Sequence, residues 1–450
     1  MGKIIRQPVV VVLGHVDSGK TLLLDKIRGT IVQSREDGGI TQHIGASFFP
    51  SETLRKICGS LISGMQSEVS IPGLLVIDTP GHEVFANLRN RGGSAADISV
   101  LVVDCVRGFE VQTYESLEIL KSRHVPFVVA LNKVDLISGW RSSPKLTLSD
   151  SISKQEHSVE RSLDEQIYTV VGELSRLGFA SEFVSRVRDF AKEIAIVPIS
   201  AKTGEGIPEL MTVLIGLTQQ YLTKKLVVTE GPARGIVLEM KEELGLGQTA
   251  DVILLDGVLK DGEMIAMGKR DGPISTKIRA IFLPKPLDEM RDPRDRFTAV
   301  DTVHAAAGVK IAAPEIEGVL AGSPFLSIPQ GFDKAESLEQ IAREIESVFI
   351  EVDTLGVVIK ADTLGSLEAL IAILKHNSVP IRLADIGRVS KRDVVEAVMV
   401  ADKDPYLGAI ISFRSNILPD AEDYLKTTNV KFFSDPIIYN LVDNYLASDT

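Results

Sequence analysis

Eight residues near the start of the chain combine side chains and glycines that suit a phosphate-binding loop. They read Gly-His-Val-Asp-Ser-Gly-Lys-Thr and directly follow the apolar run Val9–Leu13. A buried strand that enters such a loop, with a helix opening at Lys20, brings backbone N–H groups and a positive helix N-terminus to one point. Lys20 can then bridge the β- and γ-phosphates of a nucleotide, and the Thr21 hydroxyl can bind Mg²⁺. The predicted phosphate-binding residues are Gly14, His15, Val16, Asp17, Ser18, Gly19, Lys20 and Thr21.

A second group of polar residues follows the apolar run Leu74–Ile77, which predicts another buried strand. A carboxylate at the carboxyl end of a parallel strand, as predicted for Asp78, can hold Mg²⁺ through water. The Gly81 N–H has no side chain in its way and can approach the γ-phosphate. His82 lies where an attacking water must be oriented, and it is the candidate catalytic residue. The predicted nucleotide-binding residues of this segment are Asp78, Thr79, Pro80, Gly81 and His82.

The motif that follows the apolar run Phe127–Leu131 predicts which base the nucleotide carries. It reads Asn132-Lys133-Val134-Asp135. The Asp135 carboxylate can accept hydrogen bonds from the N1–H and exocyclic amine of guanine, and a site of this kind rejects analogues that lack those donors. Asn132 can brace the loop, and the stem of Lys133 can cover the face of the base. The motif therefore predicts a guanine nucleotide, GTP or GDP.

Two further segments complete the predicted site. The run Ala195–Ile199 ends in Ser200-Ala201-Lys202, whose backbone can contact the guanine oxygen. The polar segment Thr30–Gly45 has no helical or strand period and is predicted to be a loop. A loop with one well-placed Thr suits a nucleotide switch, in which the hydroxyl joins the Mg²⁺ shell only while the γ-phosphate is present. A glycine-rich surface loop without a role is an alternative that these residues leave open.

The order of the motifs predicts an α/β fold for the first domain, residues 1–228. Apolar runs alternate with helical patterns, which is typical of a doubly wound parallel sheet that binds its ligand at the carboxyl ends of the strands. An insertion, Leu136–Lys192, carries the amphipathic pattern Leu163–Leu177 and is interpreted as a pair of surface helices. The other predicted elements are the strand Ile98–Val103 and the helices Lys20–Ile27, Val111–Ser122 and Ile207–Leu222.

Beyond residue 228 the pattern changes twice. Residues 229–331 contain β-rich runs and three Asp-Gly pairs, at 256, 261 and 271, which predict hairpins of a small antiparallel β-barrel. The β-rich runs are Gly235–Met240, Thr249–Leu255, Met264–Met267 and Thr276–Leu283. The charged segment Arg291–Arg296 favours a solvated loop over an RNA contact, because it also carries acidic residues.

The remaining residues predict a linker and a third domain. Residues 332–350 form an amphipathic linker helix in this interpretation, and residues 351–437 form a third α/β/α domain without a phosphate loop or a catalytic cluster. Residues 438–450 predict the start of a long helix. The predicted elements of the third domain are the strands Val357–Lys360, Ile381–Ala384, Ala409–Ile411 and Val430–Phe433 and the helices Ser366–Lys375 and Lys391–Ala401.

Composition limits the class of protein. The 450 residues suggest about three domains, and the apolar (44%) and charged (24%) contents are ordinary for a globular protein. The net charge of −12 argues mildly against a general nucleic-acid binder, but it allows a local patch that contacts a ribonucleoprotein. No apolar run is long enough for a membrane span, and neither a signal peptide nor a disulfide framework is indicated. A cytoplasmic protein is expected.

Together these motifs resemble those of the translational GTPases. The markers are Gly-His-Val-Asp-x-Gly-Lys-Thr at residues 14–21 and Asp-Thr-Pro-Gly-His at residues 78–82. Three segments, Gly38–Gly45, Asp78–Phe85 and Lys360–Ala369, further resemble the family of translation initiation factor 5B, the counterpart of the second bacterial initiation factor. The resemblance covers essentially the whole chain.

The resemblance implies a GTPase that promotes the joining of ribosomal subunits and hydrolyses GTP efficiently only on the large subunit. In this family, ribosomal RNA helps to position the histidine that matches His82. Val16 and Ile40 match the apolar gate around that histidine. A monomer is expected, with the ribosomal subunits, their RNA and proteins, and initiator tRNA as partners, and with other initiation factors as further candidates.

The resemblance also implies ligands for two metal ions. Thr21 and Thr41 match the residues that bind Mg²⁺, and Asp78 matches the carboxylate that holds this ion through water. Asp17 and the backbone of Gly39 match a site for a monovalent cation, Na⁺ or K⁺. Such a cation would neutralise charge that develops during phosphoryl transfer.

One departure from the family concerns the C-terminal part. Members carry a fourth, C-terminal barrel on a long helix, and this barrel binds the acceptor end of initiator tRNA, whereas the present sequence ends before it. GTP chemistry and ribosome docking are expected to reside in these 450 residues, and direct recognition of the tRNA end is not.

Rival classes fit only parts of the sequence. An elongation-type GTPase that carries aminoacyl-tRNA should have two barrels after its first domain, whereas the third unit here has an α/β pattern. The same objection applies to the initiation GTPase that delivers initiator tRNA in its own ternary complex. A non-hydrolysing, GTP-gated scaffold would need no water-positioning group at His82.

Overall fold

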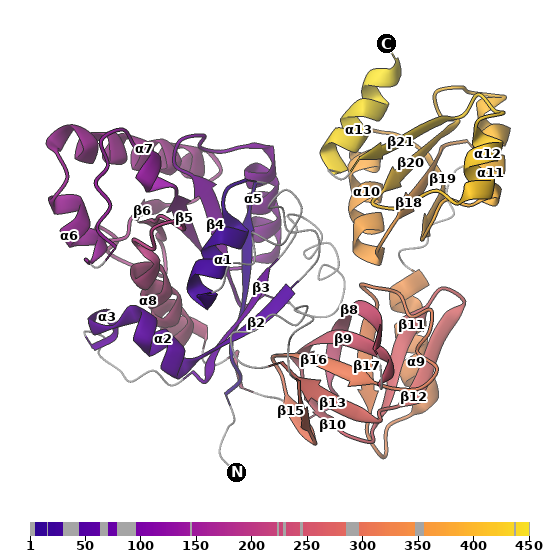
Figure 1. Cartoon of the computed structure of the whole chain (residues 1–450), viewed down its shortest axis with the longest axis horizontal. Coiled ribbons are helices and arrows are strands. Elements are labelled where there is room, and N and C mark those ends of the chain that lie inside the picture. Colours follow the sequence, from indigo (N-terminus) through magenta and orange to yellow (C-terminus); the bar gives the residue numbers. More distant parts are fainter. Residues whose placement is uncertain are drawn as a thin grey trace.

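The computed structural model describes residues 5–15, 17–29, 45–63, 71–78, 96–144, 146–222, 225–227, 231–243, 246–284, 297–346, 355–435 and 438–449. Three β-sheet units follow one another along the chain, and each encloses its own apolar core (Figure 1). The overall class is α/β, as predicted.

The first unit is a seven-stranded sheet with six parallel strands. The edge strand β2 runs antiparallel to its neighbour β3. In spatial order the strands are β2 (Gly45–Pro50), β3 (Gly73–Asp78), β1 (Val9–Gly14), β4 (Ile98–Asp104), β5 (Phe127–Asn132), β7 (Ile194–Pro198) and β6 (Ser181–Phe183). The central strands are apolar throughout because helices cover both faces. The predicted doubly wound sheet is confirmed.

Helices on the two faces close this unit. Residues of α5 (Val111–Arg123) and α7 (His157–Arg176) join one core, and residues of α1 (Lys20–Arg28), α2 (Ser51–Cys58) and α8 (Ile207–Leu217) join the other. A short helix, α3 (Ser60–Ser63), follows α2. The predicted helix at 207–222 is α-helical only to Leu217 and continues as the π-helical turn Thr218–Leu222. Strand β2 and helices α2 and α3 were not predicted.

The insertion contains more than the predicted pair of surface helices. Both helices are present, α6 (Leu148–Ser153) and α7, but α7 is a core helix as much as a surface one. Its buried face consists of Val159, Leu163, Ile167, Val170 and Leu174. The insertion also supplies β6, which lies parallel to β7 at the sheet edge. A strand of three residues is too short to show an alternating pattern, so the sequence does not reveal it.

The second unit is an antiparallel β-barrel domain around a single core. In spatial order its strands are β12 (Gly272–Lys277), β11 (Met264–Lys269), β17 (Pro324–Ile328), β8 (Arg234–Glu243), β9 (Gly247–Asp256), β16 (Ala307–Ala312), β13 (Ala280–Leu283) and β14 (Thr298–Val300). A separate pair joins β10 (Val258–Lys260) to β15 (Thr302–His304).

The Asp-Gly prediction is only partly right. Asp271-Gly272 lies at a hairpin between β11 and β12. The pairs at 256 and 261 flank β10, which pairs with the distant β15 rather than with its sequence neighbours. The predicted run Thr276–Leu283 is divided between β12 and β13, because the chain leaves one strand pairing and enters another at 278–279. The charged segment Arg291–Arg296 lies outside the described residues.

Helix α9 (Lys334–Glu346), at the position of the predicted linker, packs on the barrel. Ile341 and Ile345 share a core with Leu326 and Ile328 of β17. The helix is therefore anchored along its apolar face, with its charged residues on the other side.

The third unit is a four-stranded parallel sheet, as its α/β pattern predicts. In spatial order its strands are β19 (Ile381–Ile386), β18 (Val357–Ala361), β20 (Ala409–Phe413) and β21 (Lys431–Asp435). Its helices are α10 (Leu364–His376), α11 (Lys391–Ala401), α12 (Pro419–Leu425) and α13 (Ile438–Leu446). Helix α12 was not predicted. Leu441 and Tyr445 place α13 against the same core as α10.

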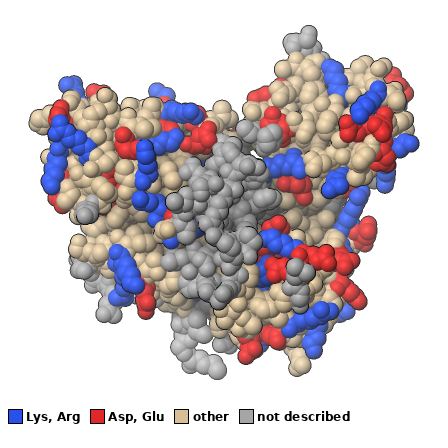
Figure 2. Space-filling model, in the orientation of Figure 1, with Lys and Arg blue, Asp and Glu red and all other residues tan. Residues whose placement is uncertain are grey.

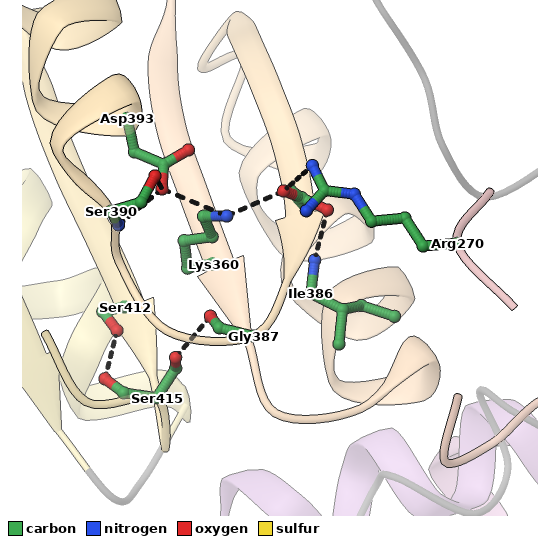
Figure 3. Close-up of polar contacts among 9 residues, drawn as sticks. Arg270, Lys360, Ile386, Gly387, Ser390, Asp393, Ser412 and Ser415 are labelled. Atoms are coloured by element: carbon green, nitrogen blue, oxygen red, sulfur yellow. Dashed lines mark hydrogen bonds and ion pairs between the residues drawn. The ribbon is translucent and has the colours of Figure 1, made fainter. Parts of the chain in front are cut away.

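A network of charges, buried in the third unit and exposed at Arg270 of the barrel, joins the second and third units (Figure 3). Lys360 of β18 is 3% exposed, and its Nζ lies 2.7 Å from Asp385 Oδ2 and 3.1 Å from Asp393 Oδ2. Arg270, in the β11–β12 turn of the barrel, places Nη2 2.6 Å from the same Asp385 oxygen. The backbone N–H and hydroxyl of Ser390 donate to Asp393 at 2.7 Å each. One carboxylate thus receives a cation from each unit.

Replacement of Lys360 by methionine is expected to destabilise the third unit by about 3 kcal/mol, because it leaves two buried carboxylates without their shared cation. Native-state hydrogen exchange of the β18–β21 amides measures the loss. Lys426→Met is the matched control, since Lys426 is largely exposed beside Glu422, and it should leave exchange unchanged. Equal protection in the two variants would show that the network does not stabilise the sheet.

Candidate guanine-nucleotide site

Two glycines give the loop between β1 and α1 its shape. Gly14 and Gly19 have φ values of 139° and 92°. A Cβ would lie 2.2 Å from the Val102 carbonyl oxygen at the first position and 2.4 Å from Asn132 Nδ2 at the second. Glycine is therefore required at both positions by backbone conformation and by space.

The polar side chains of this loop suit a phosphate group. Lys20 Nζ donates to the carbonyl oxygens of Gly14 (2.8 Å) and His15 (2.7 Å), so the ammonium lies inside the curve of the loop. The buried Ser18 hydroxyl has no hydrogen-bond partner within the part of the chain that the structure describes. Thr21 is buried on the first turn of α1. A ligand with several acceptor oxygens fits this arrangement.

His15 and Asp17 line the outer part of the loop. Asp17 has a left-handed backbone, with φ of 67°. Burial lowers the pKa of His15, although Glu110 opposes this effect with its Oε1 3.6 Å from Nε2. The imidazole is therefore mostly neutral near pH 7 and adds little charge at the loop.

Asp78 ends β3 beside the start of this loop, since its register partner on β1 is Val12. The predicted placement of the Asp78 backbone at the carboxyl edge of the sheet is confirmed. Several predicted positions lie outside the described residues, as does the Asp78 side chain, so their roles stay predictions. These positions are Val16, Gly39, Ile40, Thr41, Thr79, Pro80, Gly81 and His82.

Asn132, at the end of β5, ties two loops together. Its Nδ2 donates to the Ser18 carbonyl oxygen at 2.7 Å, and its Oδ1 accepts from the Ala201 N–H at 2.9 Å. The side chain is fully buried, with 1% of the residue exposed. A single amide therefore fixes the distance between the phosphate-binding loop and the loop at 200–202.

Asp135 is oriented by the same loop. The Ser200 hydroxyl donates to Asp135 Oδ1 at 2.6 Å, and the Val134 N–H donates to the Ile199 carbonyl oxygen at 3.2 Å. Lys202, the last residue of the predicted motif, is exposed. The ends of β5 and β7 thus bring together the two motifs that are predicted to recognise the base, as their order in the sequence predicts.

Lys133 has a left-handed backbone, with φ of 70°, and its Nζ lies 2.7 Å from Asp104 Oδ2. Asp104 ends β4 and was not predicted as a site residue. Burial alone would raise the pKa of Asp104, but hydrogen bonds from Lys133 and from the N–H groups of Val106 and Arg107 bring it below the ordinary value. Its only sequence signal is a polar residue at the end of an apolar strand.

Glu205 is a second residue that the sequence does not reveal. Its carboxylate accepts from the Ser143 N–H (2.7 Å) and from the hydroxyls of Ser151 (2.8 Å) and Thr203 (2.8 Å). Burial would raise the pKa of Glu205, but these bonds, with one from Trp140, lower it overall. The charged carboxylate therefore joins the insertion to the loop at 200–205.

Comparisons with known proteins indicate a GTP-binding first domain. A family model described as "Elongation factor Tu GTP binding domain" matches residues 6–220, and one described as "Translation-initiation factor 2" matches residues 330–446. The probable translation initiation factor IF-2 of Thermofilum pendens is 51% identical over 98% of this chain and 73% of its own length. The protein of the same name from Aeropyrum pernix is 50% identical over 98% of this chain and 72% of its own length.

A solved structure supports the same assignment. The crystal structure of GDP-bound aIF5B from Aeropyrum pernix is similar with a TM-score of 0.83 and 49% identity, and the match covers 99% of this chain and 74% of that one. The identity and the coverage of the relatives are both high, and the described loops bring together the residues of the predicted guanine-nucleotide site. The chain belongs to the translation initiation factor IF-2 family, which includes aIF5B, and it is a translational GTPase that binds guanine nucleotides and hydrolyses GTP.

Proposed function

We propose that this protein promotes the joining of ribosomal subunits during initiation and hydrolyses GTP when the assembled ribosome stimulates it. Its membership of the initiation factor family supports the role in initiation. The observation that supports the chemistry most directly is the position of Asn132, which bonds both the phosphate-binding loop and the loop at 200–202. The two loops are thereby held at a fixed separation, so that one nucleotide could bind with its phosphates at the first loop and its base at the second.

The proposed roles of Lys20, Lys133 and Asp135 rest on the geometry of their loops and on the type of each side chain, and that of His82 rests on the sequence motif and the family resemblance. Lys20 and the N–H groups of its loop bind the phosphates, and the Asp135 carboxylate accepts from the N1–H and amine of guanine. The Lys133 stem covers the base. His82 orients the attacking water, and it acts only when the ribosome positions it. GTP hydrolysis by the free protein is therefore slow.

Mg²⁺ suits the oxygen donors that we propose for it. Thr21 is buried on the first turn of α1, and the Asp78 backbone lies at the neighbouring strand end. In the proposal Thr21 and Thr41 bind the ion and Asp78 holds it through water, while Asp17 and the Gly39 backbone bind a monovalent cation, Na⁺ or K⁺. When bound, the metal ions would neutralise charge on the phosphate oxygens.

The proposed partners are the ribosomal RNA and proteins of both subunits, and initiator tRNA. On the face drawn in Figure 2, basic and acidic side chains are interspersed over the three units, so contact with RNA would rest on local groups of cations. The described residues include no helix that could cross a membrane. A monomer acting in the cytoplasm completes the proposal.

The proposed division into domains follows the three sheet units. It consists of a GTP-binding domain at 1–228, a barrel at 229–331, a helix at 332–350, an α/β domain at 351–437 and a terminal helix from 438. The packing of α9 on the barrel supports a barrel domain that moves together with this helix.

Phosphate release from GTP, measured with and without purified ribosomal subunits, tests the proposed function. We expect turnover to be slow for the protein alone and to rise about a thousandfold or more when both subunits are present, as for other GTPases whose partner completes the site. Each subunit added alone is the control and should give little stimulation. Equal turnover in all four mixtures would contradict ribosome-dependent hydrolysis.

A further inference from the structure

The two carboxylate oxygens of Asp104 contact different groups. Oδ1 accepts hydrogen bonds from the backbone N–H groups of Val106 (2.8 Å) and Arg107 (3.2 Å), which shapes the turn after β4. Oδ2 lies 2.7 Å from Lys133 Nζ. The Asp104 side chain is only 4% exposed and that of Lys133 is 27% exposed, so the pair is largely shielded from solvent.

The backbone holds the two residues of this pair in fixed relation. Asp104 and Asn132 are register partners at the carboxyl ends of β4 and β5, and the Cys105 N–H extends the ladder to the Asn132 carbonyl oxygen at 2.8 Å. Lys133, the next residue, has a left-handed backbone. The end of β5 thus fixes the position of the Lys133 backbone, and the Asp104 carboxylate fixes the position of its ammonium.

We propose that Asp104 is a positioning residue of the guanine site, which holds the Lys133 ammonium so that the apolar stem lies across the face of the bound base. This inference rests on the proposed binding of guanine at these loops. A long lysine stem has several rotatable bonds, so anchoring the ammonium before the nucleotide arrives lowers the entropy lost on binding.

The surroundings of Asp104 keep its carboxylate ionised. Burial raises the pKa of Cys105 to about 12, and the nearby carboxylates of Asp104 and Asp135 add to this effect. The pKa of Asp104 itself is lowered, so the carboxylate is ionised across the neutral range. The Asp104 partner of the ion pair is therefore charged when the nucleotide binds.

The anchored stem and the Asp135 carboxylate should have different effects on base recognition. Asp135 distinguishes guanine from hypoxanthine through the exocyclic amine, whereas a stem on the face of the ring contacts both bases alike. Loss of the anchor should therefore weaken the binding of GDP and of IDP by the same factor. Loss of the Asp135 carboxylate should weaken GDP more than IDP.

The test is a double-mutant cycle with Asp104→Asn and Lys133→Met, read out as the dissociation constants of GDP and IDP. Asparagine keeps an oxygen for the Val106 and Arg107 N–H groups and removes the charge that holds Lys133. Methionine keeps an unbranched apolar stem and removes the ammonium. We expect each single variant to bind both nucleotides about tenfold more weakly, and the double variant to be no weaker than Lys133→Met alone.

Asp164→Asn is the matched control, because Asp164 pairs with Arg186 on the surface of the same unit, away from the nucleotide loops. It should leave both dissociation constants unchanged. Unchanged binding by Asp104→Asn would overturn the inference, and so would a tenfold loss that persists in the Lys133→Met background, since that loss would arise from the turn alone. A loss for GDP but not for IDP would also overturn it.

Two further measurements keep the inference testable and separate it from the proposed function. If Asp104→Asn fails to fold, Lys133→Arg can still pair with Asp104 and should bind GDP more tightly than Lys133→Met, and equal affinities would contradict the anchor. Asp135→Asn tests the guanine site itself. If that variant binds GDP normally, the base-recognition proposal fails. If it loses affinity for GDP more than for IDP while Asp104→Asn changes neither affinity, only the positioning role of Asp104 is overturned.

Discussion

Replacement of His82 by alanine is expected to lower ribosome-stimulated GTP hydrolysis about a thousandfold while GTP affinity changes by no more than about twofold. A positioned imidazole that orients an attacking water contributes on the order of 10²–10⁴ to the rate. In the proposed site Lys20, the N–H groups of its loop and Mg²⁺ hold the phosphates, so binding should not need the imidazole. The measurement is phosphate release in single-turnover conditions with both ribosomal subunits present.

A control separates the catalytic role from a general effect of removing a histidine. His157, at the start of α7, is fully exposed and pairs only with Glu160 among the ion pairs of the described residues. His157→Ala should hydrolyse GTP at the normal rate. Normal turnover by His82→Ala as well would remove the catalytic assignment, and a parallel loss of GTP affinity would indicate a binding role instead.

The loop motifs could be predicted because each follows a strand that is buried on both faces. Continuous apolar runs such as Val9–Leu13 and Phe127–Leu131 mark central strands of a parallel sheet, and the polar residues that end them must meet at one edge. The structure confirms this for Gly14, Asn132 and Ser200, whose loops share hydrogen bonds through Asn132.

Elements stabilised mainly by distant partners could not be predicted. Strand β2 pairs antiparallel with β3, and its sequence, Gly-Ala-Ser-Phe-Phe-Pro, lacks the alternation that marks a strand. Strand β10 pairs with β15, more than forty residues away, so the adjacent Asp-Gly turns gave a misleading hairpin signal. In both cases tertiary contacts decide the structure, and a local pattern carries little information about them.

The supporting residues of the site were missed for a related reason. Glu205 and Asp104 belong to no short motif, and their importance follows only from the groups that reach them. A carboxylate in a loop is usually solvated, and nothing in the sequence shows that Ser143 or Lys133 is near. Residues that belong to short motifs are therefore easier to predict than the residues that hold those motifs in place.

Replacement of Asp135 by asparagine is expected to weaken GTP binding at least about a hundredfold and to favour XTP instead. The carboxylate accepts from two donors on guanine, whereas an amide offers one acceptor and one donor. Xanthine has a carbonyl oxygen where guanine has its amine, so it presents the pattern that asparagine complements. Sites that hydrogen-bond a substrate group discriminate strongly against analogues that leave buried groups unpaired.

Asparagine is the informative substitution because it can preserve the architecture of the loop. Its Oδ1 can still accept from the Ser200 hydroxyl, which lies 2.6 Å from Asp135 Oδ1, so the loop at 200–202 should stay in place. Competition binding with GTP and XTP measures the change in preference. Asp423→Asn, an exposed site on α12 of the third unit, makes the same substitution far from the sheet edge and should leave both affinities unchanged.

The two affinities distinguish base recognition from loss of structure. If a folded Asp135→Asn variant binds XTP more tightly and GTP more weakly than the wild type does, that result would show that the Asp135 carboxylate recognises the base. Equal weakening of both nucleotides would indicate that Asp135 acts through the loop that Ser200 and Asn132 support. Unchanged GTP affinity would mean that the base is recognised elsewhere, and it would contradict the proposed orientation of the nucleotide from Lys20 to Asp135.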